Sequence, residues 1–251
     1  KMGLIALKQF YCKFHGAKII PEREARSFFP DSKFSHPFRT ADGEDPAKIP
    51  RFKTCKFRES EEDVNKLLMY TGGSVECFSW LPERAEYQED IENARFIAIG
   101  VHKSVNPIHI KGKPFTCKNM IQIHELHGIY SPWADVEEST LSGALSLGIC
   151  HSYGCVFKLQ WCPLSSTWED ESLWNQVQGR ESLGILAACF GDGSLRIFNV
   201  PHPSSLRDEE DESMKPIFIQ LEHMFSFMSD NSCINRVKWS VTSTDTRLLF
   251  G

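Results

Sequence analysis

The sequence predicts an all-β fold, and one hairpin-like stretch together with an internal repeat carries that prediction. Two apolar runs, Gly184–Phe190 and Ser194–Val200, flank Gly191-Asp192-Gly193, whose residues tolerate the positive φ angles of a tight hairpin turn. The first run is apolar on both faces of a strand, so it needs cover from both sides. A similar pair of apolar runs occurs earlier in the chain, as described below.

The second run of this hairpin is expected to be less enclosed than the first, because it carries Arg196 and Asn199. Pro201 and Pro203 follow it, and neither has the backbone N–H that a central strand donates to its neighbour. The hairpin is therefore predicted to have an inner strand, an outer strand and a sharp end.

A further pattern repeats along the chain: an aliphatic residue stands five positions before a tryptophan. The tryptophans are separated by 81 residues and then by 78 residues. The three pairs, which we take as structural repeat positions, are Val75 and Trp80, Val156 and Trp161, and Ile234 and Trp239. We expect the three tryptophans to occupy equivalent positions, each on a strand.

The segments that follow each tryptophan also correspond. Arg95–His102 matches the first strand of the hairpin, and Met120–Leu126 matches the second. Leu145–Cys150 is expected to be a closing strand, and the third unit offers only Arg247–Gly251. Four short strands per unit, repeated radially, make a blade of a β-propeller. We therefore predict a partial propeller of about two and a half blades over residues 71–251.

The repeat interval is long, because a WD-type propeller blade spans ~40–45 residues. The surplus falls in polar segments at residues 83–93, 164–182 and 207–213, where added loop length costs little free energy. Long loops are the favoured interpretation, and an additional weak blade hidden within each interval is the alternative.

Residues 1–70 do not share the repeat. They are rich in proline and charge, which predicts an irregular N-terminal extension. Within it we expect a short helix at Glu22–Phe28 and a helical turn at Glu61–Leu68.

The chain begins with a lysine and ends inside an apolar run, so we interpret it as a fragment of a longer protein. A propeller fragment leaves a blade face bare, and we expect the terminal apolar residues of this one to be exposed. These residues are Leu248, Leu249 and Phe250.

Composition limits the classes of function and the cellular compartment that the sequence suggests. The net charge of −5 argues against a free-standing nucleic-acid binder, which more usually has a basic surplus. Nine cysteines without disulfide-scaffold spacing favour a reducing compartment, and Cys77, Cys155 and Cys189 lie in apolar runs typical of buried thiols. No apolar stretch reaches the ~18 residues of a membrane span, so we expect no membrane contact.

No residues are assigned to catalysis, a cofactor or a metal. The sequence contains no Gly-x-Ser-x-Gly elbow, no phosphate-binding glycine loop and no His-Glu-x-x-His motif. The cysteines and histidines lack the paired Cys-x-x-Cys spacing of structural zinc sites. We therefore expect neither a metal site nor a small-molecule substrate.

One basic stretch with interleaved phenylalanines offers candidate phosphate contacts within a larger assembly. An ordinary solvated surface is the alternative, and the acidic net charge favours it. The candidates are Lys48, Arg51, Lys53, Lys56 and Arg58.

Taken in order, the motifs "YTGGSVECFSWLPE", "RFIAIGVH", "GCVFKLQWCP" and "LGILAACFGDGSLRIFNVPHP" resemble the WD-repeat subunit of TFIIIC, the multi-subunit factor for RNA polymerase III. The resemblance covers roughly residues 28–251. It implies a WD-type β-propeller in a nuclear, non-catalytic scaffold that holds other TFIIIC subunits. Promoter DNA, on tRNA and 5S rRNA genes, would then be contacted only indirectly or weakly.

The sequence departs from the WD pattern at its best-known position. Phe198-Asn199 and His124-Glu125 stand where the Trp-Asp pair falls, whereas Asp192 keeps the turn aspartate. A WD-like adaptor of another nuclear or cytoplasmic complex, in chromatin or RNA processing, therefore stays open as the alternative.

Overall fold

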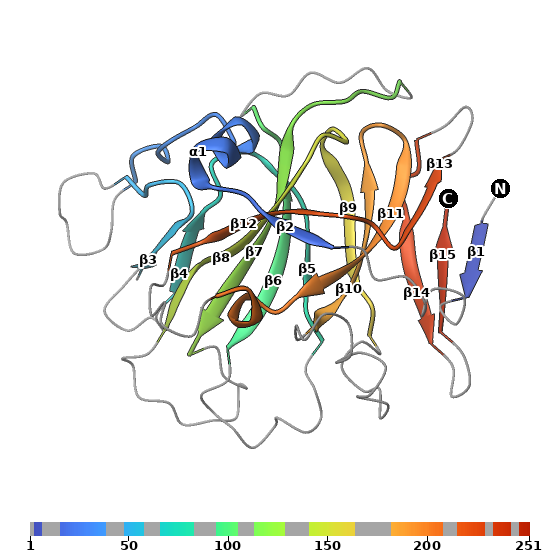
Figure 1. Cartoon of the computed structure of the whole chain (residues 1–251). Coiled ribbons are helices and arrows are strands. Elements are labelled where there is room, and N and C mark those ends of the chain that lie inside the picture. The colour runs from blue at the N-terminus through green and yellow to red at the C-terminus, as the bar shows by residue number, and fades with distance from the viewer. Residues whose placement is uncertain are drawn as a thin grey trace.

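The computed structural model describes residues 3–6, 16–38, 48–57, 66–82, 94–104, 113–128, 141–163, 182–207, 215–228, 233–241 and 246–251. These residues form four β-sheets and little helix. Figure 1 shows the three larger sheets side by side, with β1 and β15 at one end of the row. The predicted all-β class is confirmed.

The first sheet is an antiparallel meander of four strands, extended at its outer edge by two more. The meander consists of β5 (Val75–Trp80), β6 (Arg95–Val101), β7 (Asn119–His127) and β8 (Ser142–His151). The strand β12 (Ile217–Leu221) pairs in parallel with β8, and β2 (Ala17–Ile19) pairs with β12. The expected closing strand at Leu145–Cys150 lies within β8.

The second sheet repeats this arrangement with four antiparallel strands. In sheet order they are β9 (Val156–Trp161), β10 (Ser182–Phe190), β11 (Ser194–Pro201) and β13 (Phe225–Met228). The β10–β11 hairpin turns at Gly191–Gly193, where Gly193 has a φ of 88° that a side chain would strain.

The third sheet is shorter. It contains β14 (Val237–Val241), β15 (Thr246–Phe250) and the N-terminal strand β1 (Gly3–Ala6). A separate hairpin of β3 (Lys53–Phe57) and β4 (Lys66–Tyr70) forms the remaining sheet.

The chain crosses between sheets in one place that the repeat did not predict. After β11 it passes through a 3-10 helix, Pro203–Leu206, adds β12 to the first sheet, and then returns to the second sheet as β13. The parallel β8–β12 pair is possible because a long stretch of chain separates the two strands. The crossover ties the first two sheets together.

Two apolar cores explain why β10 is apolar on both faces. Leu186, Ala188 and Phe190 belong to the core shared with the first sheet. Ile185 and Ala187 alternate with them and belong to the core shared with the third sheet. The predicted need for cover on both sides of this strand is therefore met by two neighbouring sheets.

The N-terminal segment is more ordered than we expected. The helix α1 (Glu22–Ala25) continues as a 3-10 helix over Arg26–Phe28, which confirms the predicted helix. The helical turn predicted at Glu61–Leu68 is wrong where it is described, because Lys66–Tyr70 is the strand β4; residues 61–65 lie outside the described residues.

Instead of an irregular extension, residues 1–70 contribute strands β1 to β4, and the first two complete sheets formed by the rest of the chain. The pattern missed them because short strands that pair with distant partners leave no local repeat. The domain boundary at residue 70 stays a prediction.

Two expectations about exposure are wrong. The strand β11 is buried along its whole length, because β13 pairs with its outer edge and neighbouring sheets cover its faces. Leu248 and Phe250 are also buried, because they pack against the second sheet, where the Phe250 ring lies 5.0 Å from that of Phe227. Leu249 is half-buried.

The strands described do not close into a ring of blades, so the propeller stays a prediction. Of the three polar loops, residues 83–93, 164–181 and 208–214 lie outside the described residues. Counted from the strand that carries one tryptophan up to the strand that carries the next, each unit contains four described strands of one sheet, and the second unit also contains β12. In the part of the chain that is described, no helix is long and apolar enough to cross a membrane.

Candidate functional site

The repeated tryptophans make a repeated contact between sheets. The indole Nε1 of Trp161, at the end of β9, donates to the carbonyl oxygen of Ser79 at 3.1 Å. The indole Nε1 of Trp239, in β14, donates to the carbonyl oxygen of Gln160, also at 3.1 Å. Ser79 precedes Trp80 and Gln160 precedes Trp161, so the acceptor occupies the same repeat position each time.

Strand register agrees with this equivalence. Trp80 lies opposite Ile97, Trp161 opposite Leu186 and Trp239 opposite Leu248, in each case across the first two strands of a sheet. The aliphatic members of the later pairs, Val156 and Ile234, are buried. In the second and third sheets the tryptophan motif therefore marks the strand that packs on the sheet before it.

The first unit differs from the other two in burial. Trp161 and Trp239 are 2% and 4% exposed, whereas Trp80 is 45% exposed. Phe78 and Val75 on the same strand are 58% and 52% exposed. Within the described part of the chain, nothing accepts a hydrogen bond from the Trp80 indole.

The exposed side chains follow from the strand's alternation. Cys77, on one face of β5, belongs to the core shared with the second sheet, while Phe78 and Trp80 are two residues apart on the opposite face. The β3–β4 hairpin places Leu67 and Met69 against β6 on that opposite face but leaves β5 open. We call Val75, Phe78 and Trp80 the exposed β5 residues.

Phe78 was missed by the sequence analysis, although a signal was present. It stands three residues after Val75, where the other two units have Leu159 and Val237, and both of these are buried. An aromatic residue at a position that is otherwise aliphatic and buried could have marked the strand.

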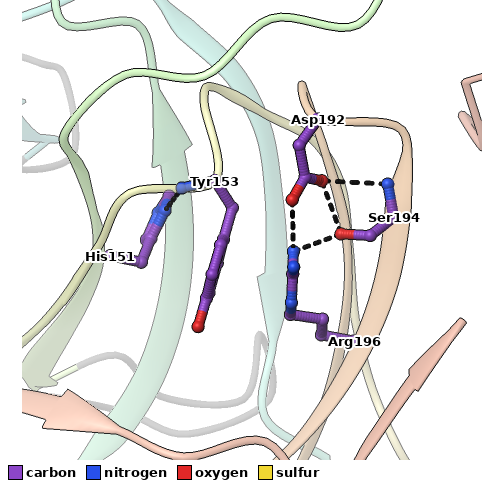
Figure 2. Close-up of polar contacts among 5 residues, drawn as sticks. All are labelled: His151, Tyr153, Asp192, Ser194 and Arg196. Carbon is purple, nitrogen blue, oxygen red and sulfur yellow. Dashed lines mark hydrogen bonds and ion pairs between the residues drawn. The ribbon is translucent and has the colours of Figure 1, made fainter. Parts of the chain in front are cut away.

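A buried polar cluster sits at the β10–β11 turn (Figure 2). Asp192 accepts hydrogen bonds from the backbone N–H and the hydroxyl of Ser194, at 2.9 and 2.5 Å. Its other carboxylate oxygen accepts from the Arg196 guanidinium at 2.8 Å, and both side chains are largely buried. The aspartate therefore fixes the turn and balances a charge that would be costly to bury alone.

The cluster reaches across to the first sheet. The Arg196 guanidinium carbon lies 3.5 Å from the centroid of the Tyr153 ring, within cation–π range. Tyr153 donates its backbone N–H to Nδ1 of His151 at 3.3 Å, and the two rings are stacked. The His151 ring also packs edge-on against Phe190 of the second sheet. The arrangement locks two sheets to each other.

Its histidine is not suited to proton transfer at neutral pH. Burial, with a smaller effect from the Arg196 charge, lowers the pKa of His151 to about 3. Burial likewise lowers the pKa of His124, whose Nε2 pairs with Gln122 at 3.0 Å, to about 3. Both imidazoles are therefore neutral at pH 7.

The cysteines that were expected to be buried are buried. Burial raises the pKa of Cys77 and of Cys189 to about 12, and it also raises that of Cys155. Protonated thiols are weak nucleophiles and weak metal ligands. Among the described residues, no group of three or more histidine, cysteine or acidic side chains is placed to hold a metal ion.

The candidate phosphate contacts do not form one basic face. Arg51 is half-buried and bound by internal contacts: it donates to the Pro30 carbonyl and lies 4.8 Å from the Phe29 ring centroid, and burial lowers its pKa. Lys53 and Lys56 are exposed but stand three residues apart on β3, on opposite faces.

The two remaining candidates add little to such a face. Lys48 is exposed, and Arg58 lies outside the described residues. No more than part of the stretch can therefore face one phosphate backbone.

Comparison with known proteins gives one kind of relative. The chain is 24% identical to general transcription factor 3C polypeptide 2 of Homo sapiens over 215 residues, which cover 81% of this chain and 22% of that protein. The protein of the same name from Pongo abelii matches to the same extent. The chain thus spans less than a quarter of the length of these relatives. No family model matches it.

Proposed function

We propose that the chain belongs to a non-catalytic scaffold subunit of a TFIIIC-type transcription factor, and that it acts in the nucleus in support of RNA polymerase III promoter recognition. The observation that carries the proposal is the similarity to general transcription factor 3C polypeptide 2, which extends over 81% of the chain. The order of the tryptophan motifs, read independently, points to the same factor.

In this proposal the three sheets are blades of a WD-type β-propeller. Two features support the blade interpretation: the four antiparallel strands, in chain order, of each of the first two sheets, and the tryptophan contact that repeats from sheet to sheet. Propeller blades offer rigid surfaces. In this chain the buried Asp192–Arg196 ion pair and the crossover through β12 both help to fix the first two sheets against each other. A rigid surface suits a subunit whose task is to hold other subunits of the factor.

DNA is a secondary contact in this proposal. The net charge is −5, and internal contacts occupy Arg51, one of the five basic residues of the stretch. Lys48, Lys53 and Lys56 can add local attraction to phosphates but not a continuous basic track. Promoter affinity and sequence preference are therefore expected to come from a partner subunit.

The experiment is affinity purification of the tagged full-length protein from nuclear extract, with identification of the proteins that co-purify. The proposal predicts the other TFIIIC subunits in stoichiometric amounts. As a matched control, the variant Ala188→Asp places a charge in the core between two sheets and should lose these partners together with its fold. Recovery of only chromatin or RNA-processing proteins would instead support the WD-like adaptor.

A further inference from the structure

The first two sheets differ at their outer edges. In the first sheet the fourth strand of the meander, β8, pairs with β12, and β12 pairs with β2. The corresponding strand of the second sheet is β13, which pairs with β11. Among the described residues, β13 is the last strand of its sheet. The position that β12 fills beside β8 therefore has no counterpart beside β13 in the described part of the chain.

The sequence of β13 does not protect this edge. Edge strands of soluble proteins are usually guarded against pairing with other chains by lysine, other charged side chains or proline. Phe225–Met228 contains none of these residues. Instead Phe227 is 39% exposed and Met228 is 57% exposed. An exposed apolar edge of this kind is a template for the addition of another extended chain.

The first sheet shows how little such an addition requires. The strand β12 is added to β8 through three residue pairs, from Ile217 opposite Leu147 to Ile219 opposite Ile149. Phe218 and Ile219 are neighbours in sequence, so they point to opposite faces of the sheet, and both are buried in apolar cores. A short strand with apolar side chains on both faces is thus enough, and the four residues of β13 are long enough to receive one.

The side chains of β13 set the chemistry of the added strand. On one face, the Phe227 ring lies 5.0 Å from the ring of Phe250 in the third sheet. On the opposite face, Met228 is exposed. A strand beside β13 therefore needs an apolar residue next to Phe227 and another, adjacent in its own sequence, next to Met228. A charged residue at either position would be brought against apolar side chains, which costs free energy.

A second copy of the chain does not fit this edge well. Two β13 strands paired edge to edge would form a contact only ~14 Å long. A stable interface between two folded bodies buries about 800 Å² on each partner, much more than such a strand pair offers. An extended segment that is anchored elsewhere in an assembly does not have this requirement, because main-chain hydrogen bonds and a few side chains suffice to dock it.

We propose that the outer edge of β13 at Ser226–Met228 binds one extended apolar segment of another subunit by addition of a strand to the second sheet. This inference rests on the proposed scaffold function, because the occupant is a subunit that the scaffold holds. It adds the place of the contact and the chemistry of the segment that docks there.

The first test is a photo-crosslink from the edge. The full-length protein carries p-benzoylphenylalanine at position 228, where the native side chain is exposed, and is purified with its partner subunits before irradiation. We expect a link to one apolar segment of a TFIIIC subunit. Position 220 is the matched control: Gln220 is also exposed, but its strand β12 is paired on both sides, so it should not give this link.

The second test introduces the missing edge charge. Met228→Lys should reduce the recovery of the crosslinked subunit by at least about tenfold, because the lysine lies against the apolar segment. Gln220→Lys should leave the recovery unchanged, and thermal unfolding of both variants shows whether they are folded. A synthetic peptide of the crosslinked segment should bind the unmodified protein and bind Met228→Lys more weakly.

Three outcomes would overturn the proposal: a link from position 228 only to a second, differently tagged copy, a link only within the same polypeptide, or a full set of partner subunits without any link. Full recovery of the subunits by folded Met228→Lys would overturn it as well. The scaffold function fails in a different way, since TFIIIC subunits are then absent from the purified complex.

Discussion

Trp239 and Gln160 are joined across two sheets by the same hydrogen bond, 3.1 Å long, that joins Trp161 and Ser79 one unit earlier. The regular spacing of the tryptophans in the sequence therefore corresponds to a repeated hydrogen bond between neighbouring sheets. It also sets apart Trp80, the tryptophan of the series on which no sheet of the described residues packs.

The first prediction compares these tryptophans in residues 1–251. Trp161→Phe removes the donor to the Ser79 carbonyl at a buried junction, so the free energy of unfolding should fall by about 1–3 kcal/mol. Trp80→Phe, at an exposed position, should change it by less than about 0.5 kcal/mol. Urea unfolding followed by far-UV circular dichroism measures both, and equal losses would contradict the burial difference.

The second prediction concerns the buried ion pair. Asp192→Ala should lower the free energy of unfolding by about 3–5 kcal/mol, because it leaves the Arg196 charge buried without its partner. The double variant with Arg196→Met should be more stable than Asp192→Ala alone, since no charge is then buried. Thermal unfolding of the two single variants and the double variant completes the cycle. A double variant less stable than both single variants would exclude this account.

The third prediction concerns pH. The pKa values of His124 and His151 are about 3 in the folded chain, below the ordinary value of 6.5. At pH values between about 3 and 6.5, these two histidines bind protons in the unfolded chain but not in the folded chain. The free energy of unfolding should therefore fall as the pH drops from 7 towards 4, by up to about 1.4 kcal/mol per pH unit for each histidine.

Denaturant titrations at several pH values measure this slope. His124→Leu should flatten it, whereas the control variant His36→Ala, at an exposed site, should leave it unchanged. An unchanged slope in His124→Leu would show that this histidine does not resist protonation in the folded chain.

The fourth prediction tests the crossover strand. Phe218 of β12 packs against Phe29 of the N-terminal segment and shares a core with Met120 and Leu145. Phe218→Ala should cost about 3–5 kcal/mol, whereas Gln220→Ala, at an exposed position of the same strand, should cost less than about 0.5 kcal/mol. Comparable unfolding midpoints for the two variants would mean that β12 does not help to hold the sheets together.

Local patterns were enough to predict the seven strands from β5 to β11. Apolar runs marked β6, β7, β10 and β11, and the tryptophan spacing aligned one unit with the next. These features are local because antiparallel neighbours follow each other along the chain and a hairpin turn such as Gly191–Gly193 links them directly.

Pairings between distant segments were not predictable in this way. The pairs β12 with β8, β2 with β12 and β1 with β15 join segments far apart in sequence, and none leaves a periodic signal. The roles of the arginines were also hidden, because charge alone does not show that Arg196 pairs with Asp192 or that Arg51 packs on Phe29. The chain end at Leu248 and Phe250, which was expected to be exposed, proved to be buried, whereas Phe78 and Trp80 of β5 are exposed.

The scaffold role is tested most directly by a binding titration on a tRNA-gene promoter fragment at fixed salt concentration. The account predicts that the purified full-length protein alone binds weakly and without sequence preference, and that it binds tightly and specifically only with its TFIIIC partner subunits. Tight, sequence-specific binding by the protein alone would contradict the account.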